Sequence, residues 1–126
     1  MADFALAERR SKPRIPTESL VVSVRRKGRI NRLVGLAINF NRYGVAIVLD
    51  QPLNKDSTVY LALSHGDTHV DELIGVVHNC ISQDQGYRCG IQFRTQSPMQ
   101  FDREMVESRL RQLEARFSAH TSLTEV

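Results

Sequence analysis

The chain has 126 residues, and its 41% hydrophobic and 25% charged content is ordinary for one globular domain and excludes a disordered chain. No apolar run approaches the roughly 20 residues of a membrane helix, and the opening residues lack the apolar stretch of a secretion signal, so we expect a cytoplasmic protein. The net charge is only +3, but 9 Lys and Arg stand against 3 Asp and Glu through Gly35, and 8 against 11 beyond it. This asymmetry indicates an anionic partner near the N-terminus.

Residues 1–16 are expected to form a basic arm in front of the first apolar pattern. The arm contains "ERRSKPR", with Arg9, Arg10 and Arg14, and the prolines on either side of Arg14 favour extended backbone. Each guanidinium can bind a phosphate, or the O6 and N7 atoms of guanine, through two hydrogen bonds. Ordering these residues costs on the order of 6–12 kcal/mol, which two or three such contacts do not clearly cover. The arm therefore needs a second surface on the folded body.

Six short runs rich in β-forming residues follow the arm, and turn signals separate them. With no long helical pattern between them, they predict an antiparallel sheet that closes into a small barrel over residues 17–96. The expected fold class is mainly β, a six-stranded antiparallel β-barrel with a flexible N-terminal arm and a C-terminal α-helix. The expected strands are 19–25, 30–38, 45–49, 58–63, 69–81 and 87–93.

A helical pattern over residues 97–119 completes this single domain, and residues 120–126 are expected to fray. Ser97 is the predicted N-cap, and the proline after it suits the first helical position. An apolar stripe runs along the helix and is expected to cover an open end or an edge of the barrel; a coiled-coil surface is the weaker alternative. The stripe consists of Val106, Leu110, Leu113 and Phe117.

The segment "NFNRYG" (39–44) links two expected strands and is the candidate for the second surface. Asn39 and Asn41 are two residues apart, so their amides would point the same way from an extended chain and could bind the edge of a nucleobase. Gly44 stands where a turn could require a positive φ. Alternatively, the segment is an ordinary turn whose amides bond only to their own backbone.

Taken together, these two segments resemble the PilZ domain family. The family's signature is R-x-x-x-R in an N-terminal arm, followed after one hairpin by [D/N]-x-S-x-x-G on the barrel. Here these motifs are similar to "RSKPR" (10–14) and "NFNRYG" (39–44), and a "GYRCGIQF" hairpin with a downstream helix also fits the family. The resemblance spans roughly residues 8 to 115. One position departs from the motif, because Asn41 replaces the serine.

The resemblance implies a receptor for cyclic di-GMP, a bacterial second messenger with two guanines and two phosphates. It assigns Arg10 and Arg14 to phosphate and guanine edges, Asn39 to guanine, Asn41 to the serine position, and Gly44 to the turn. Arg9 would stack on a base, a feature that goes with binding of a ligand dimer. The resulting hypothesis is a cytoplasmic bacterial effector whose arm orders over the ligand and is then read by a downstream protein partner.

Other classes of function receive less support. No catalytic motif is present, so we predict that the protein is not an enzyme. His65, His69, Cys80 and Cys89 match no recognised zinc motif, so no metal is expected, and the cysteines should face each other across a hairpin. Nucleic-acid binding is disfavoured because the second basic cluster, "RRKGR" (25–29), has no interleaved aromatics. Two alternatives remain: a degenerate PilZ-like module that binds only a protein partner, and a small nucleic-acid-binding barrel.

Overall fold

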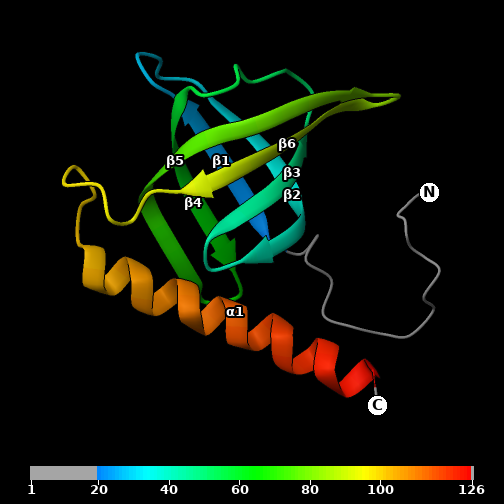
Figure 1. Cartoon of the computed structure of the whole chain (residues 1–126), viewed down its shortest axis with the longest axis vertical. Coiled ribbons are helices and arrows are strands. Elements are labelled where there is room, and N and C mark those ends of the chain that lie inside the picture. Colours follow the sequence, from blue (N-terminus) through cyan, green and yellow to red (C-terminus); the bar gives the residue numbers. More distant parts are fainter. Residues whose placement is uncertain (1–19, 126) are drawn as a thin grey trace.

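The structure is a computed structural model that describes residues 20–125, with side chains described through residue 117 (Figure 1). The predicted fold class is confirmed, because six antiparallel strands form a closed barrel that a C-terminal helix follows. The basic arm lies outside the described residues. The elements are β1 Val21–Arg26, β2 Arg32–Asn41, β3 Gly44–Leu49, β4 Thr58–His65, β5 Thr68–Gln83, β6 Gly86–Phe93 and α1 Arg103–Glu125.

Around the barrel, the strands follow the order β1-β2-β3-β6-β5-β4, and β4 pairs with β1 to close the ring. Every neighbouring pair is antiparallel. Along β1, β3 and β4, buried residues alternate with partly exposed ones, as expected for strands with one face on a core. The inward aliphatic side chains fill the interior, as they do in other small barrels.

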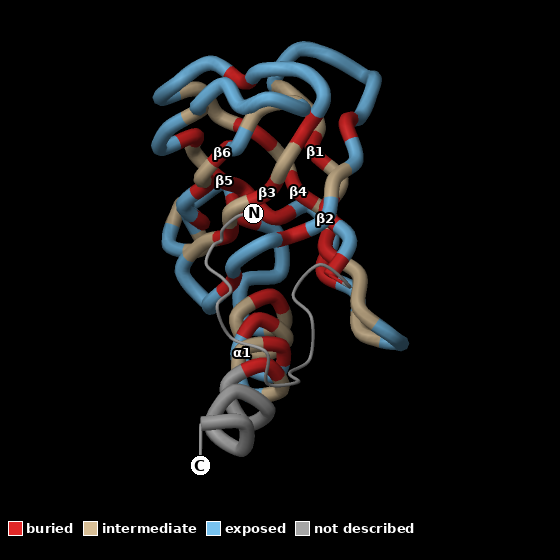
Figure 2. The backbone as a smooth tube through the Cα atoms, turned by 90° about the vertical axis from the view of Figure 1, so that its right-hand side faces the viewer, coloured by how far each residue is buried: buried red, intermediate tan, exposed pale blue. Residues whose placement is uncertain are grey.

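One face of α1 packs on an open end of this barrel, where the buried residues of strands and helix meet (Figure 2). The predicted apolar stripe is buried, and its last residue, Phe117, lies edge-on to Phe40 with ring centroids 5.9 Å apart. Polar contacts attach the helix to the β4–β5 turn, because Arg116 bonds to His65 and Thr68, and Arg109 donates to the His69 carbonyl. The interpretation of the stripe as a barrel cover is therefore confirmed.

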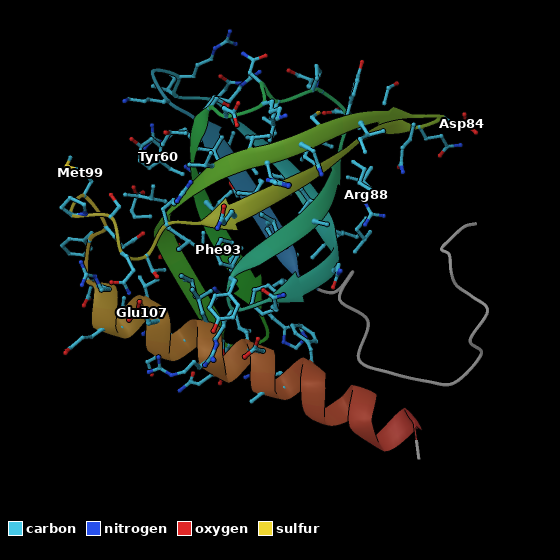
Figure 3. The ribbon with its side chains drawn as sticks, in the orientation of Figure 1. Tyr60, Asp84, Arg88, Phe93, Met99 and Glu107 are labelled. Carbon is cyan, nitrogen blue, oxygen red and sulfur yellow. The ribbon has the colours of Figure 1, made fainter. Side chains whose placement is uncertain are left out.

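Strand β5 is longer than its partner β4, and beyond β4 its second half forms a long hairpin with β6, the β5–β6 ribbon, whose β6 strand also pairs with β3. Figure 3 shows Asp84 at the tip of this ribbon, well away from α1. The register pairs Cys80 with Cys89, so the two cysteines do face each other across the hairpin. A bulge between Val77 and Asn79 interrupts the pairing on the barrel side of the cysteines.

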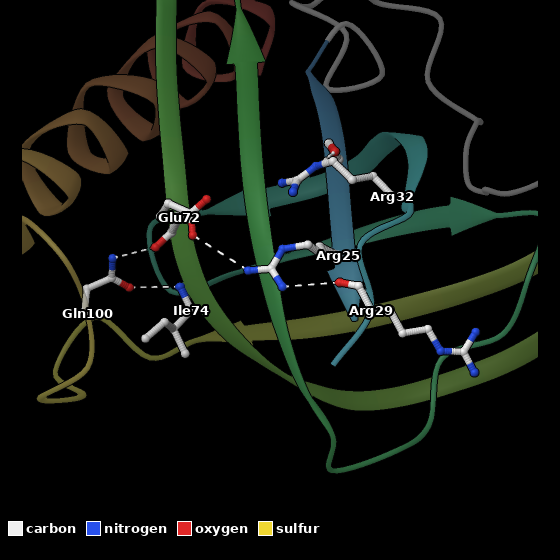
Figure 4. A network of polar contacts seen from close by, with 7 residues as sticks. Arg25, Arg29, Arg32, Glu72, Ile74 and Gln100 are labelled. Atoms are coloured by element: carbon white, nitrogen blue, oxygen red, sulfur yellow. Dashed lines mark hydrogen bonds and ion pairs between the residues drawn. The ribbon is translucent and has the colours of Figure 1, made fainter. Parts of the chain in front are cut away.

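The helix begins at Arg103, so the prediction of Ser97 as its N-cap is wrong. The Ser97 hydroxyl instead accepts from the Met99 N–H, and the Ser97 carbonyl accepts from the Gln100 N–H, which makes a separate turn. The buried Gln100 side chain holds this turn against β5: its Oε1 accepts from Ile74 N–H at 2.9 Å and its Nε2 donates to the Glu72 carbonyl at 2.9 Å (Figure 4). Contacts across the fold thus outweigh the local capping signal.

The far end of α1 also differs from the expectation. The helix continues to Glu125, so residues 120–125, which were expected to fray, are helical. The predicted helix over residues 97–119 is therefore shifted toward the C-terminus.

Candidate ligand-binding site

A hollow of about 420 Å³ lies on the outer surface where the β2–β3 hairpin meets β5 and β6. The predicted residues Asn39, Asn41 and Gly44 all line it, so the structure brings them together. The other predicted site residues, Arg9, Arg10 and Arg14, lie outside the described residues. The full lining is Asn39, Phe40, Asn41, Tyr43, Gly44, Val45, Ala46, His78, Gly90, Ile91 and Gln92.

Asn39 lines this hollow. It lies on β2 opposite Ala46, and it is exposed while the next residue, Phe40, is buried in the core. Asn39 and Asn41 therefore share the outer face of the strand, as their spacing predicted. Among the described residues, the Asn39 side chain makes no hydrogen bond. Its amide can offer both donors and an acceptor to the edge of a nucleobase.

Unlike Asn39, Asn41 uses its side chain to stabilise the turn between β2 and β3. Its Oδ1 accepts hydrogen bonds from the backbone N–H of Tyr43 at 2.8 Å and of Gly44 at 3.1 Å. These bonds close the two-residue turn between β2 and β3, so the ordinary-turn interpretation is correct for the oxygen of Asn41. A serine hydroxyl can accept the same kind of bond, so asparagine in place of the motif serine preserves the turn.

Glycine is required at position 44 because β3 and β6 approach each other closely there, and not because of a turn conformation. It begins β3, and its φ is not among the positive values of the described residues, so the expectation of a positive φ is wrong. A Cβ at this position would lie 2.6 Å from the Ile91 carbonyl oxygen of β6. The glycine therefore lets β3 and β6 come together beneath the hollow.

Three polar or small residues of the β5–β6 ribbon complete the hollow and were missed by the sequence reasoning: His78, Gly90 and Gln92. The Asn79 Oδ1 accepts from the Gly90 N–H at 3.1 Å across the bulge, and His78 is the residue without a partner there. The pairing of the cysteines could have placed Gly90 near Asn79. The bulge that turns His78 toward the hollow had no signal in the sequence.

Arg42 connects the β2–β3 turn to α1. The Arg42 N–H donates to Oε2 of Glu114 on α1 at 3.1 Å, and the Arg42 guanidinium lies 3.7 Å from the other carboxylate oxygen. The same guanidinium lies over the Tyr43 ring, 5.1 Å from its centroid. The turn that forms one wall of the hollow is thus attached directly to α1.

Near the base of the ribbon, the sulfur atoms of Cys80 and Cys89 are 3.2 Å apart as free thiols. Cys89 is buried, and this burial, together with the hydrogen bond and the charge of Cys80, raises the pKa of Cys89 to about 12. Cys89 therefore remains a neutral thiol at physiological pH, with little nucleophilic character.

This shifted pKa predicts a loss of stability at high pH. The unfolded thiol ionises near pH 9 while the folded thiol stays protonated toward pH 12, so its contribution is complete below about pH 9 and falls as the pH rises. The free energy of unfolding should fall by up to about 1.4 kcal/mol per pH unit from this group. Urea denaturation of the wild type and of Cys89→Val across this range should show a shallower pH dependence in the variant. Equal slopes would contradict the assignment.

Of the histidines considered as zinc ligands, His65 has other side-chain contacts. His65 bonds to Arg116 on α1 and packs against Phe117, with ring centroids 5.1 Å apart. Among residues 20–125, no group of three or more potential metal ligands comes together. Within the same residues, no helix combines the length and the apolar character needed to cross a membrane.

Comparison with known proteins assigns the chain to a family. A search of curated proteins finds no match. The sequence model of the PilZ domain, however, matches residues 8–112, which include the three arginines of the basic arm, the whole barrel and the first part of α1. PilZ domains are ligand-binding receptor modules whose ligand is cyclic di-GMP. The chain belongs to the PilZ domain family.

Proposed function

We propose that this chain is a cyclic di-GMP receptor in which the arginine arm closes over a ligand held in the hollow. Asn39 would bind a guanine edge, Arg10 and Arg14 would bind phosphate and guanine, and Arg9 would stack on a base. Asn41 and Gly44 would shape the wall of the site. Because cyclic di-GMP is a bacterial second messenger and the family is a receptor family, the proposal includes a cytoplasmic location in a bacterium and no catalytic activity.

The observation that carries this proposal is that the hollow lacks cationic side chains of its own. Among the described residues, neither lysine nor arginine lines it, although the ligand brings two phosphate charges. Two bound anionic groups need cationic partners, and the matched family region begins at residue 8, in front of Arg9, Arg10 and Arg14. The described surface supports recognition of the bases, and the arm would supply the positive charge.

Calorimetric titration of cyclic di-GMP tests the assignment of the arm. We expect micromolar affinity for the wild type, equivalent to about 8 kcal/mol. Arg10→Ala and Arg14→Ala should each lose about 1–3 kcal/mol, since each removes a contact with two hydrogen bonds. Arg103→Ala, which removes an exposed arginine of α1 away from the hollow, is the matched control and should bind as the wild type does. Circular dichroism checks that each variant is folded.

The outcomes separate the receptor from the alternative. Wild type that binds no ligand would contradict the receptor proposal and favour a PilZ-like module that binds only protein. Ligand binding that survives both arginine substitutions would exclude the arm from the site. The stoichiometry reports whether one ligand or a dimer binds. If a dimer binds, Arg9→Ala should reduce the number of ligands bound per chain.

Signalling through the arm is a further part of the proposal. An arm that orders on the ligand should gain hydrogen-exchange protection in its presence, and the ordered arm would form a new surface for a downstream protein. Equal protection of residues 8–16 with and without ligand would contradict this switch.

A further inference from the structure

A second and larger cavity lies outside the hollow that the family motif describes. It is a groove of about 950 Å³ between the outer face of β4, β5 and β6 and the side of α1. Tyr60 of β4 and Val76 of β5 contribute partly exposed apolar surface to it, and the buried side chains of Ile74 and Leu110 also line it. Figure 3 shows Tyr60, Met99 and Glu107 along this one side of the molecule. We call this cavity the basic groove, because Lys27, Arg42, Arg94 and Arg111 line it.

Four cationic side chains line the basic groove, and they come from four separate parts of the chain. Lys27 lies in the β1–β2 turn, Arg42 in the β2–β3 turn, Arg94 directly after β6, and Arg111 on α1. Of these, only Arg42 has an ion-pair partner among the described residues. The groove therefore combines apolar surface with three cations, Lys27, Arg94 and Arg111, that have no ion-pair partner among the described residues.

One carboxylate lies among these cations, and local hydrogen bonds hold it. Glu107 accepts from the Thr95 hydroxyl at 2.9 Å and from the Gln96 amide at 2.8 Å through the same oxygen. It fixes the loop after β6 to α1 and so shapes the groove. The lining thus retains four cations against one carboxylate, which favours an anionic occupant.

Exposed apolar side chains at the edge of the groove indicate a macromolecular occupant. Met99, which lines the groove, is 79% exposed, and Phe101 in the same loop is 72% exposed. Large apolar side chains that remain exposed beside a groove mark protein contact surfaces, and methionine adapts to a range of apolar partners. Gln100 between them anchors this loop, so the two side chains are presented on a fixed support.

The arrangement of the cations fits carboxylates along a peptide better than one phosphate group. A phosphate site needs convergent donors, commonly glycine-rich backbone or a helix N-terminus, whereas no glycine lines the described groove and α1 contributes only residues beyond its first turn. Nucleic acid is disfavoured as well, because arginines already cover the two tyrosine rings: Arg25 lies 4.5 Å from the centroid of Tyr60, and Arg42 covers Tyr43.

From these observations we infer that the basic groove is a docking site for an acidic segment of a partner protein that also carries apolar side chains. The carboxylates would pair with Lys27, Arg94 and Arg111, and the apolar side chains would pack against Val76 and Met99. The inference rests on the proposed function only in taking this partner as the downstream protein. The docking itself requires no cyclic di-GMP.

Selection from a displayed library of short random peptides tests the inference. The library is selected on the wild-type protein and counter-selected on the double variant Arg94→Glu, Arg111→Glu, whose exposed substitutions leave the core unchanged. We expect the enriched peptides to combine Asp and Glu with Leu, Met or Phe. A synthetic enriched peptide should bind the double variant at least about tenfold more weakly in fluorescence anisotropy, as expected for reversed charges at an interface.

The double variant Lys55→Glu, Arg88→Glu provides the matched control, because both side chains are exposed, neither lines the groove, and the net charge changes by the same amount. It should leave peptide affinity nearly unchanged, which separates docking in the groove from attraction by net charge. No enrichment, or enriched peptides without acidic residues, would overturn the inference. Tighter binding of a single-stranded oligonucleotide than of any peptide, lost in the Arg94→Glu, Arg111→Glu variant, would assign the groove to nucleic acid. All arms run without cyclic di-GMP, so they fail or succeed independently of the receptor proposal.

Discussion

Gly44→Ala is expected to destabilise the protein by about 2–3 kcal/mol, because the added Cβ would lie 2.6 Å from the Ile91 carbonyl oxygen and force β3 away from β6. A backbone oxygen cannot rotate aside as a flexible side chain does. The displaced strands form the base of the hollow, so ligand affinity should fall together with stability. Urea denaturation measures the first effect, and calorimetric titration of cyclic di-GMP measures the second.

Gly28→Ala is the matched control for this prediction. Gly28 has a positive φ of 80° in the β1–β2 turn, and a Cβ there would meet no atom within 4 Å among the described residues. Its substitution should therefore cost about 1 kcal/mol through backbone strain alone and leave ligand binding intact. If Gly44→Ala costs no more than Gly28→Ala, the close approach of β3 and β6 is not what requires glycine.

Gln100→Leu should destabilise the barrel by about 2–3 kcal/mol, since it leaves the Ile74 N–H and the Glu72 carbonyl without their hydrogen-bond partner. The Ile74 N–H is buried, so water cannot replace the lost bond without disturbing the loop. The same substitution should release the loop that carries Met99. Urea denaturation measures the stability, and hydrogen exchange at Ile74 should show faster opening.

Gln96→Leu is the control for Gln100→Leu. The Gln96 side chain is exposed and bonds to Glu107 on the surface, so its loss should change stability by less than about 1 kcal/mol. Equal stability of the two variants would show that the buried amide of Gln100 contributes little.

The strands and the buried face of the helix could be predicted because their signals are local. Alternation in β1 and β3, and the spacing of Val106, Leu110 and Phe117, directly encode which side chains face the core. The start of α1 could not be predicted in this way. Ser97 has the composition of an N-cap, but Gln100 bonds to residues of β5 that lie far away in the sequence, and those bonds determine the path of the chain.

In the candidate site, too, local features could be predicted and features that depend on strand pairing or turn length could not. The spacing of Asn39 and Asn41 predicted one shared face, and the structure has it. The sequence did not show that Asn41 would bond to the backbone while Asn39 stays free for a ligand. That difference arises from the short turn, which brings the Tyr43 and Gly44 N–H groups to Asn41. His78 joined the site through a bulge, a feature of strand pairing that no single strand encodes.

Tyr43 and Gln92 line both the hollow and the basic groove, so the two cavities share a wall. A nucleotide in one and a peptide in the other would lie against the same two side chains. Their affinities would then be thermodynamically linked: by whatever factor the second messenger strengthens or weakens the partner, the partner changes the affinity for the second messenger by the same factor. The sensitivity of the receptor would therefore depend on the concentration of the partner, and the cell could adjust its response threshold without changing the protein.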